Sequence, residues 1–386
     1  MPPRGPVRLR FQLAAFTLTR TVLNTGYRMV YPFLPVIARG LGVDLSTVAL
    51  AVTARSSLGL ARPFLGSAAD VRGRKTTMLF SLALAGAGFA IVSLWPTYPV
   101  LFASMLLAGG GKIMFDPAMQ AYVGDRVDYS RRGLVIALTE FGWSGAFLIG
   151  IPIAGWIIAR GGWAAPFRWL VAFVLLAGVL LWRILPADPS PVSQRLSWSG
   201  GMRAVLASRS ALAGLALGFL ISLANESINI VFGAWLEDSF GLQVVALGAA
   251  TAVIGAAELG GEGLVAALAD RLGKRRAVAL GITFSAVACL GLPILGRSLA
   301  GALVGLFLVY ITFEFALVAA IPLMTELVPR ARATMMAGNI GAHSAGRAIG
   351  ALVGPALFSL GLQANGTLAA ALNLAALAML LLFVRE

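Results

Sequence analysis

Long apolar stretches recur along the whole chain and are separated by short polar loops. Each holds about 20 residues or more, the length that an α-helix needs to cross the hydrocarbon core of a bilayer. We therefore expect an all-α integral membrane protein. The pattern predicts twelve membrane-spanning helices, at residues 11–38, 46–68, 76–95, 99–124, 133–159, 163–185, 210–236, 243–268, 277–296, 299–325, 333–361 and 364–384.

One segment interrupts this rhythm. Residues 186–209 contain three prolines and several Ser, Gly and Arg residues, which are typical of a linker. The linker divides the chain into an N-terminal six-helix half, 1–185, and a C-terminal six-helix half, 210–386. Within it, residues 195–206 mix Trp, Met, Val and Leu with Arg, a composition that suits a short interfacial helix.

The two halves share an internal repeat at an offset of about 200 residues. Two short segments after the second and eighth spans match residue by residue, and so do acidic residues that close the fourth and tenth spans. The corresponding pairs are Asp70 with Asp270, Gly73 with Gly273, Arg74 with Lys274, Lys75 with Arg275, and Asp125 with Glu326. The repeat predicts two pseudo-symmetric halves in parallel relation, with a binding cavity between them near the midplane.

Composition and charge support this interpretation. The 386 residues are 59% hydrophobic and 12% charged, whereas a soluble domain carries roughly 25% charged residues. The net charge of +14 would suit a nucleic-acid-binding protein, but the basic residues are spread over many short loops and form no continuous face. Of the 30 Lys and Arg residues, 20 lie at the termini and in the loops on one side, and the other side keeps Arg39, Arg160 and Arg297. This asymmetry predicts cytoplasmic termini.

The cysteine content and the N-terminus add two expectations. Cys289 is the single cysteine, so disulfides and cysteine-rich metal sites are excluded, and we expect neither metal nor cofactor. Arg20 and Arg28 interrupt the first apolar run, and we interpret this run as the first helix and not as a cleaved signal.

The repeated segment carries a family resemblance. Gly66-Ser-Ala-Ala-Asp70-Val-Arg-Gly73-Arg74-Lys75 resembles the signature loop of the major facilitator superfamily, with Val71 in place of the usual Arg, and residues 266–275 resemble a second copy. The resemblance implies the major facilitator fold, in which this loop latches the halves together. It implies a latch of Asp70 and Arg74, with Asp125 as the partner of Arg74. The gating residues are then Gly66, Asp70, Gly73, Arg74, Asp125, Asp270, Gly273 and Arg275. Alternatively, these residues only orient the loop in the membrane.

The fifth span carries a second resemblance. Gly150-Ile-Pro152-Ile-Ala-Gly155 is similar to the glycine-proline motif of drug and proton antiporters, with Ile151 between Gly and Pro, and Gly354-Pro355 stands at the pseudo-symmetric place. This implies export by antiport. The alternative is that the small residues only let helices approach closely.

Thirteen ionisable residues fall inside the predicted spans. A charge at the middle of a membrane helix costs about 3 kcal/mol in lipid, so most of them must face a watery cavity or one another. Residues four apart share a helix face, which predicts a pair between Lys112 and Asp116. The resemblance implies a cavity lined by the first, fourth, seventh and tenth helices. The candidate substrate and ion site comprises Arg20, Asn24, Arg28, Arg55, Lys112, Asp116, Asn225, Glu226, Asn229, Glu258, Glu262, Glu314 and Arg347.

The two halves differ in the sign of these charges. The first holds five cations against Asp116 and Glu140, and the second holds four glutamates against Arg347 and His343. We expect an anionic or zwitterionic group to bind Arg28 and Lys112 of the first half. A carboxylate of the second half, Glu314 first, then carries a coupling proton, because burial favours the neutral acid. The alternative for each residue is a structural ion pair.

These observations predict an alternating-access secondary transporter of the cell inner membrane, acting as a monomer among membrane lipids. Proton-coupled efflux of an amphipathic organic molecule is the first hypothesis, and the alternative is a lipid or lysophospholipid flippase of the same fold. An enzyme is not expected, because the single His lies outside any His-Glu-x-x-His pattern. A receptor or sensor without transport activity is a further alternative.

Overall fold

The computed structural model describes residues 6–61, 73–124, 126–127, 139–186 and 198–384, and their regular structure is entirely helical. Contacts divide the chain into two units, which we describe separately. Unit 1 comprises Met1–Val30 and Arg62–Gln194, and unit 2 comprises Tyr31–Ala61 and Arg195–Glu386. The contacts thus group residues 31–61 with the C-terminal half, whereas the sequence predicts a division at the linker.

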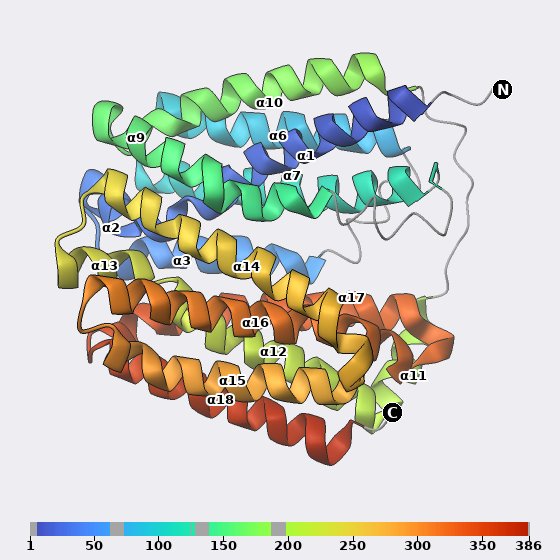
Figure 1. The fold of residues 1–386 in the computed structure, drawn as a ribbon. Coiled ribbons are helices and arrows are strands. Elements are labelled where there is room, and N and C mark those ends of the chain that lie inside the picture. Colours follow the sequence, from blue (N-terminus) through green and yellow to red (C-terminus); the bar gives the residue numbers. More distant parts are fainter. Residues whose placement is uncertain (1–5, 62–72, 125, 128–138, 187–197, 385–386) are drawn as a thin grey trace. The chain divides into compact units, whose positions relative to one another are not determined.

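Unit 1 is a bundle in which α6 packs against α7 and α10, and α1 packs against α7 and α10 (Figure 1). Its described helices are α1 (Pro6–Arg28), α6 (Arg74–Leu94), α7 (Tyr98–Gly124), the helix Thr139–Gly161 and α10 (Ala165–Ile184). The helix Thr139–Gly161 contains a π-helical turn, η2 (Ala146–Gly150), followed by α9 (Ile151–Gly161).

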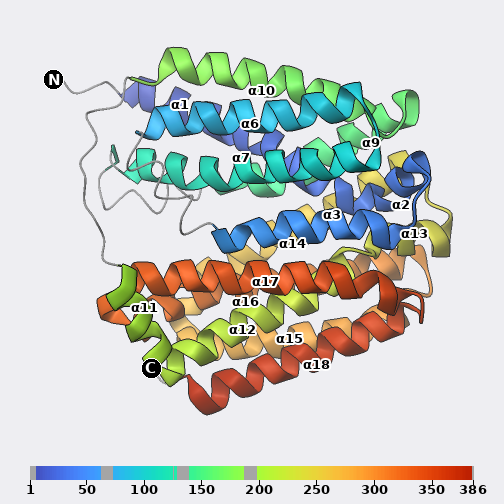
Figure 2. The ribbon, with the colours of Figure 1, turned by 180° about the vertical axis from the view of Figure 1, so that it is seen from behind.

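Unit 2 is built around α17, which packs against both α12 and α3 (Figure 2). Leu217, Ile221, Ile282, Ala316 and Met335 belong to its buried apolar core. Its elements are α2 (Val30–Leu41), α3 (Leu45–Ser57), η1 (Leu58–Ala61), α11 (Trp198–Ala207), α12 (Arg209–Asn229), α13 (Phe232–Phe240), α14 (Val244–Leu272), α15 (Lys274–Leu295), α16 (Leu299–Leu327), η3 (Pro329–Ala331), α17 (Arg332–Phe358) and α18 (Leu362–Phe383).

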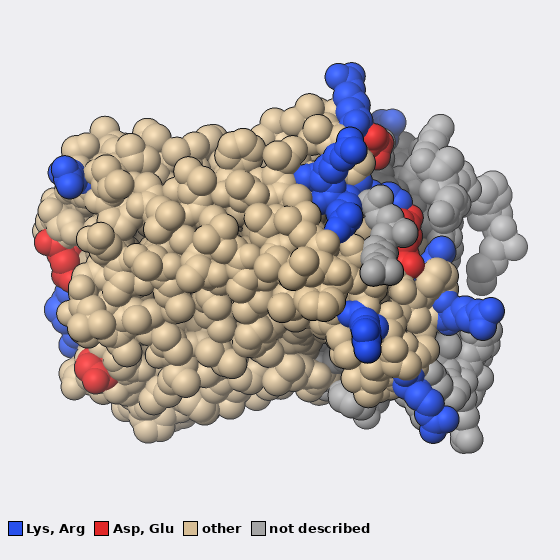
Figure 3. All heavy atoms as spheres, turned by 90° about the horizontal axis from the view of Figure 1, so that it is seen from below, with Lys and Arg blue, Asp and Glu red and all other residues tan. Residues whose placement is uncertain are grey.

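In the described residues, helices lie within each of the twelve predicted spans. Nine helices in the described residues are long and apolar enough to cross a membrane, and Val30–Leu41 and Leu45–Ala61 are shorter apolar helices. The remaining helices, α1 and α17, carry buried or half-buried charges. On the face drawn in Figure 3, a broad band of the described surface carries neither Lys, Arg, Asp nor Glu, as expected for a surface in contact with lipid.

Two predicted spans are broken where the sequence suggests continuous helices. The first is interrupted at Met29, between α1 and α2, because Pro32 has no N–H to donate to the carbonyl of Arg28. The seventh is interrupted at Ile230 and Val231, between α12 and α13. There a Cβ on Gly233 would lie 2.4 Å from the carbonyl oxygen of Pro32. The breaks occupy equivalent places in the repeat, and the two chain segments touch.

The α2–α3 connection and the linker follow local rules. Asp44 is the N-cap of α3, and its carboxylate accepts a bond from the Thr47 amide at 2.7 Å. Hydrogen bonds from Thr47 hold the pKa of Asp44 below its usual value. The linker contains α11, which confirms a short helix in this segment.

The internal repeat is visible in the helix ends. In unit 1, Lys75 Nζ donates to the carbonyls of Trp182 and Leu185, at 2.6 and 2.7 Å, and Gln12 donates to Ile184. These bonds satisfy carbonyls of the last turn of α10 that have no partner within the helix.

Unit 2 repeats this arrangement at its last helix. Arg275 donates to the carbonyls of Leu380 and Leu381, at 3.4 and 2.7 Å, and Ser210 donates to Phe383. In each unit the first and third spans therefore cap the C-terminal end of the sixth.

Candidate functional site

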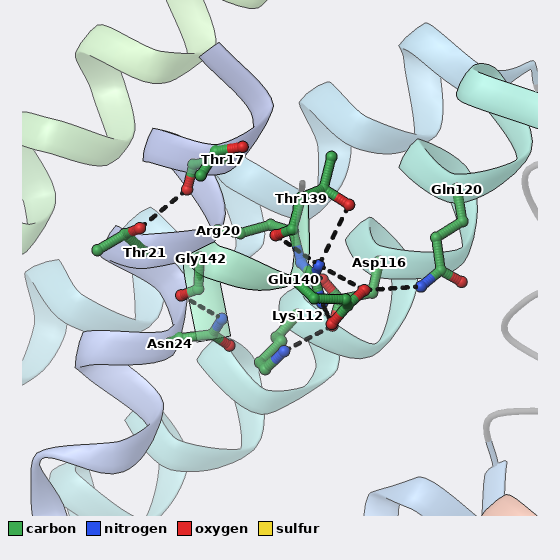
Figure 4. Close-up of polar contacts among 10 residues, drawn as sticks. All are labelled: Thr17, Arg20, Thr21, Asn24, Lys112, Asp116, Gln120, Thr139, Glu140 and Gly142. Atoms are coloured by element: carbon green, nitrogen blue, oxygen red, sulfur yellow. Dashed lines mark hydrogen bonds and ion pairs between the residues drawn. The ribbon is translucent and has the colours of Figure 1, made fainter. Parts of the chain in front are cut away.

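The first polar cluster joins α1, α7 and the helix that begins at Thr139 (Figure 4). Arg20 forms a two-point ion pair with Glu140, at 2.7 and 3.0 Å, and its Nε lies 3.2 Å from Asp116 Oδ1. The second oxygen of Asp116 accepts a bond from Lys112 Nζ at 2.5 Å. The pair of Lys112 with Asp116 expected from their spacing is therefore present. Two cations and two carboxylates balance one another in this buried cluster.

Backbone groups and amides complete the cluster. Arg20 also donates to the carbonyl oxygen of Thr139 at 2.9 Å, and Gln120 Nε2 lies 3.5 Å from Glu140. Asn24, one turn further along α1, is fully buried and donates to the carbonyl of Gly142 at 2.9 Å. The donors of this cluster lie on α1 and α7. They bond to the helix that starts at Thr139 or to Asp116.

Arg28 lies beyond this cluster, among aromatic rings. Its guanidinium carbon is 4.0 Å from the centroid of the Trp143 ring and 3.8 Å from that of Phe147. Lys112 Nζ lies 5.3 Å from the same Trp143 ring and 5.8 Å from the ring of Tyr27. Distances below about 6 Å are in the range of cation–π attraction. The side chains of Arg28 and Lys112 thus both lie within cation–π range of the Trp143 indole.

A π-helical turn lies beside these rings. Ile151 N–H bonds to the carbonyl of Ala146, five residues earlier, and Pro152 follows without an N–H of its own. Such turns widen a helix by one residue and are frequent at functional sites. Phe147 stands within the turn, and Trp143 lies one helical turn before it.

The second polar cluster lies in unit 2 and is centred on the buried carboxylate of Glu226. Glu226 accepts a bond from Asn229 Nδ2 at 3.1 Å, and Asn229 Oδ1 accepts one from the Tyr310 hydroxyl at 2.5 Å. Tyr31 interacts with Glu226 and also accepts a bond from Arg55 at 3.2 Å. The chain of contacts joins α16, α12, α2 and α3, and all five side chains are buried.

The other acidic candidates of unit 2 lie on α14 and α16. Glu258 and Glu314 are buried and Glu262 is half-buried. The two helices approach closely, since a Cβ on Gly261 would lie 2.8 Å from the Cβ of Glu314. Arg347 on α17 is half-buried, and its charge acts on Glu226 together with that of Arg55.

Asn225 and His343 complete the candidates of α12 and α17. Asn225 is half-buried beside Glu226 in the sequence. His343 Nδ1 lies 2.6 Å from the Ser222 hydroxyl, a contact between two tightly packed helices. Among the described residues, no group of three or more His, Cys, Asp or Glu is placed to hold a metal ion.

The gating motif is described in part. Gly66, Asp70 and Asp125 lie outside the described residues, so the latch of Asp70 and Arg74 stays a prediction. Gly73 and Gly273 have φ values of 93° and 82°, which explains why both copies carry glycine at this turn. Lys274 pairs with Glu326, and these two residues are the repeat equivalents of Arg74 and Asp125.

The second basic position of this motif bonds to a helix end in both copies. Arg275 bonds to the carbonyl oxygens that end α18, as Lys75 does for α10, and Asp270 is exposed near the end of α14. The described contacts of Arg275 therefore belong to a helix cap.

The glycine-rich spans pack as the close-approach alternative predicts. A Cβ on Gly142 would lie 2.8 Å from the carbonyl oxygen of Thr17 on α1. On α17, Cβ atoms at Gly346 and Gly354 would lie 2.2 and 2.9 Å from the carbonyl oxygens of Phe219 and Ser227 on α12. The small residues thus let the backbones of paired helices touch.

Sequence reasoning missed the aromatic members of both clusters. Trp143 and Phe147 follow Glu140 by three and seven residues, a spacing that places all three on one helix face. This spacing could have identified them. Tyr31 and Tyr310 carry no such signal, because each meets its partner only through tertiary packing.

Comparisons with known proteins agree with this architecture. The family model of the Major Facilitator Superfamily matches residues 16–222 and 214–386. The inner membrane transport protein YdhP of Escherichia coli (strain K12) is 24% identical over 382 residues, which cover 98% of this chain and 96% of YdhP. The Bacillibactin exporter of Bacillus subtilis (strain 168) is 27% identical over 164 residues, 40% of each chain.

A solved structure shows the same fold. The bacterial homologue of the human lysosomal transporter Spinster, in an inward-facing and occupied conformation, aligns with a TM-score of 0.77 at 16% identity. The alignment covers 98% of this chain and 97% of that one. With two matches of the family model along one chain of membrane-spanning helices, this protein belongs to the major facilitator superfamily and is a multi-pass membrane transporter.

Proposed function

We propose that this chain is a proton-coupled exporter of an amphipathic organic molecule. The observation that carries the proposal is the position of Glu226, a buried carboxylate connected by side-chain contacts to four helical segments of unit 2. A proton bound there changes the contacts of all four segments together. A transport cycle needs this coupling, because a ligand shifts a conformational equilibrium only by its differential affinity for the two states.

The surroundings of Glu226 suit a group that gains and loses a proton. Asn229 and Tyr31, which interact with it directly, are neutral, and both can bond to either form of the acid. Arg55 and Arg347 act on it through their charge. In unit 1, by contrast, Asp116 is shared by Arg20 and Lys112. Protonation of Asp116 would leave two buried cations short of a counter-charge, which is costly.

Two separate observations support export and an organic substrate. Export is favoured by the similarity to the Bacillibactin exporter of Bacillus subtilis. An amphipathic substrate fits the aromatic rings and cations that meet around Arg28, because rings bind an apolar body and cations bind a polar end.

Purified protein in proteoliposomes tests this proposal. An imposed pH gradient should drive a hydrophobic weak acid or an organic cation across the membrane, and substrate movement should in turn shift the internal pH. A panel of such compounds with no gradient-driven movement would refute proton coupling. Movement of a fluorescent lysophospholipid without any gradient would favour the flippase alternative.

We also propose that the protein resides as a monomer in the cell inner membrane with both termini cytoplasmic, the side of most basic loops. Cys289 is buried and is the only cysteine, so a Cys289→Ser background permits labelling of single introduced cysteines. A cysteine at Ser193 should react only from the cytoplasm. Labelling from the outside would overturn the orientation.

A further inference from the structure

His343, the single histidine of the chain, lies on α17 and contacts α12, the helix packed beside it in unit 2 (Figure 2). Its Nδ1 is 2.6 Å from the hydroxyl oxygen of Ser222, a residue that is fully buried. At the other ring nitrogen, a Cβ on Gly218 would lie 3.1 Å from His343 Nε2 and 2.8 Å from Asn339 Oδ1. Nε2 and this amide oxygen thus lie beside the same point of α12. Each ring nitrogen therefore has a polar neighbour.

Two rows of polar and small residues face each other along α12 and α17. Residues at four-residue steps share a helix face. The rows are Gly218, Ser222 and Glu226 on α12, and Asn339, His343 and Arg347 on α17. At one end of the rows, Gly218 lies beside Asn339. At the other end, a Cβ on Gly350 would lie 2.7 Å from the Cβ of Glu226, so the two helices run in the same direction. Ser222 is one helical turn, about 6 Å, from Glu226 along α12.

The rows lead from Glu226 toward the end at which α12 and α17 begin. These helices begin at Arg209 and Arg332, beside the basic loops that we propose to be cytoplasmic. His343 lies about 16 Å from Arg332 along the axis of α17, at about 1.5 Å per residue. In proton-coupled export the proton enters from the outside and leaves on the cytoplasmic side. The buried carboxyl of Glu226 therefore needs a route to this end.

His343 can pass on a proton, whereas the cation that follows it in the row on α17 cannot. An imidazole takes up a proton at one nitrogen and releases one from the other. Arg347 acts through its charge on both His343 and Glu226, and Arg55 of α3 acts on Glu226 as well. A guanidinium keeps its protons in proteins. Of the two titratable side chains in this row, His343 is therefore the one that can transfer a proton.

We infer that His343 relays the coupling proton between Glu226 and the end of unit 2 at which α17 begins. This inference rests on the proposed function and names a further residue of the same proton site. A proton released by Glu226 crosses one helical turn to Ser222, a gap that one water molecule can bridge. The Ser222 hydroxyl accepts it and passes its own proton to Nδ1 of His343, and Nε2 releases its proton beside Asn339. A half-turn of the imidazole restores the starting tautomer, and Glu226 is left as a carboxylate.

A proton relay and a structural contact predict different effects on Glu226. A relay changes how fast the carboxyl exchanges its proton with the solvent. It leaves the protonation equilibrium unchanged, because the initial and final states are the same with or without it. A residue that only positions Glu226 would instead change the pH at which this carboxyl is half protonated.

Time-resolved infrared spectroscopy of the purified protein in lipid bilayers measures both quantities, without any substrate. The protonated carboxyl of Glu226 gives a C=O stretching band, which is identified by its loss in the Glu226→Gln protein. After a rapid change of pH, the growth of this band gives the rate of proton uptake. Its amplitude at a series of pH values gives the midpoint pH.

His343→Asn tests the ring, because the amide can keep a hydrogen bond to Ser222 but cannot relay a proton. The rate should fall at least about tenfold at an unchanged midpoint pH, since a positioned proton-transfer group typically contributes about a hundredfold or more. Ser222→Ala should have the same effect and serves if the first variant fails to fold. The matched control is Ser227→Ala, because Ser227 is also a fully buried serine of α12 but donates to Ala224 of its own helix, at 2.8 Å. It should leave both quantities unchanged.

An unchanged rate in a folded variant, or a loss of rate explained by a shifted midpoint pH, would overturn the inference. Absence of a Glu226 band at every pH would overturn it together with the assignment of the coupling proton. If the rates change as expected but wild-type proteoliposomes show no gradient-driven movement, the proposed proton coupling is refuted and the proton route to Glu226 stands.

Discussion

In unit 1 four charged side chains pair with one another, whereas in unit 2 the carboxylate of Glu226 contacts an amide and a phenol, and the charges of Arg55 and Arg347 act on it. Arg20 and Lys112 hold Asp116 and Glu140 by several ion pairs between α1, α7 and the helix that begins at Thr139. Glu226 is connected to Asn229 and Tyr310 by one hydrogen bond at each step, and it interacts with Tyr31. Both clusters use the first helix of a repeat, α1 or α12.

This difference distinguishes the ion cluster of unit 1, which stabilises one structure, from Glu226 of unit 2, which can gain and lose a proton. Removal of one partner from a buried ion network leaves charges without compensation, so such a network holds one arrangement firmly. The amide of Asn229 and the phenol of Tyr31 can bond to Glu226 in either protonation state, while Arg55 and Arg347 act on it through their charge. We therefore assign the fixed geometry of the substrate side to unit 1 and the proton-dependent change to unit 2.

The largest effect on stability is expected for Asp116→Asn. The change deprives both Arg20 and Lys112 of a counter-charge, and loss of one partner of a buried pair costs about 3 to 5 kcal/mol. Thermal unfolding in detergent measures this. Glu237→Gln is the matched control, because Arg39 and Glu237 also pair at 2.7 Å but Arg39 is exposed. It should cost less than about 1 kcal/mol. Equal effects of the two changes would contradict a stabilising role of the cluster.

A smaller effect is expected where the paired helices touch. Gly346→Ala places a Cβ 2.2 Å from a backbone oxygen of α12, which cannot move without the helix, and should cost about 1 to 3 kcal/mol. Gly150→Ala in unit 1 meets the Thr25 side chain and not a backbone oxygen, so its cost should be lower. Gly291→Ala has open space around its Cβ and should be neutral or stabilising. The same unfolding assay ranks the three variants, and the reverse order would contradict rigid packing of α12 on α17.

The smallest effect is expected at the helix caps. Lys75→Met and Arg275→Met each remove two bonds to the last carbonyls of a helix, at a cost of about 1 kcal/mol. Lys75→Arg should retain most of the stability, and Arg183→Met, at an exposed position on the same end of α10, should change it less. If Lys75→Met matches Arg183→Met, the carbonyl bonds contribute nothing beyond a general charge effect.

Much of this architecture follows from the sequence. Apolar length predicted the helices, and the offset of about 200 residues placed Lys274 and Glu326, which pair in the structure, at the positions equivalent to Arg74 and Asp125. The four-residue spacing of Lys112 and Asp116 predicted their contact within one helix. These features depend on local period or on repetition, both of which are visible in a single chain.

Features that depend on tertiary packing were not predictable. Charge counting placed Arg55 with the cations of the first half, but the structure brings it to Tyr31 and Glu226 in unit 2. The meeting of Arg20 with Glu140 joins residues 120 positions apart. The break in the seventh span contains no proline, and the close contact of Gly233 with Pro32 beside it depends on tertiary packing.

The central claim is that Glu226, and not the ion cluster of unit 1, carries the coupling proton. Transport by the Glu226→Gln protein in proteoliposomes tests it most directly, because glutamine imitates the protonated acid at nearly the same shape. Movement driven by a pH gradient should fall at least about tenfold relative to wild type, while substrate exchange at equal pH, which needs no net proton transfer, should persist. Full gradient-driven transport by Glu226→Gln would contradict the account, and equal loss of exchange would reduce Glu226 to a structural residue.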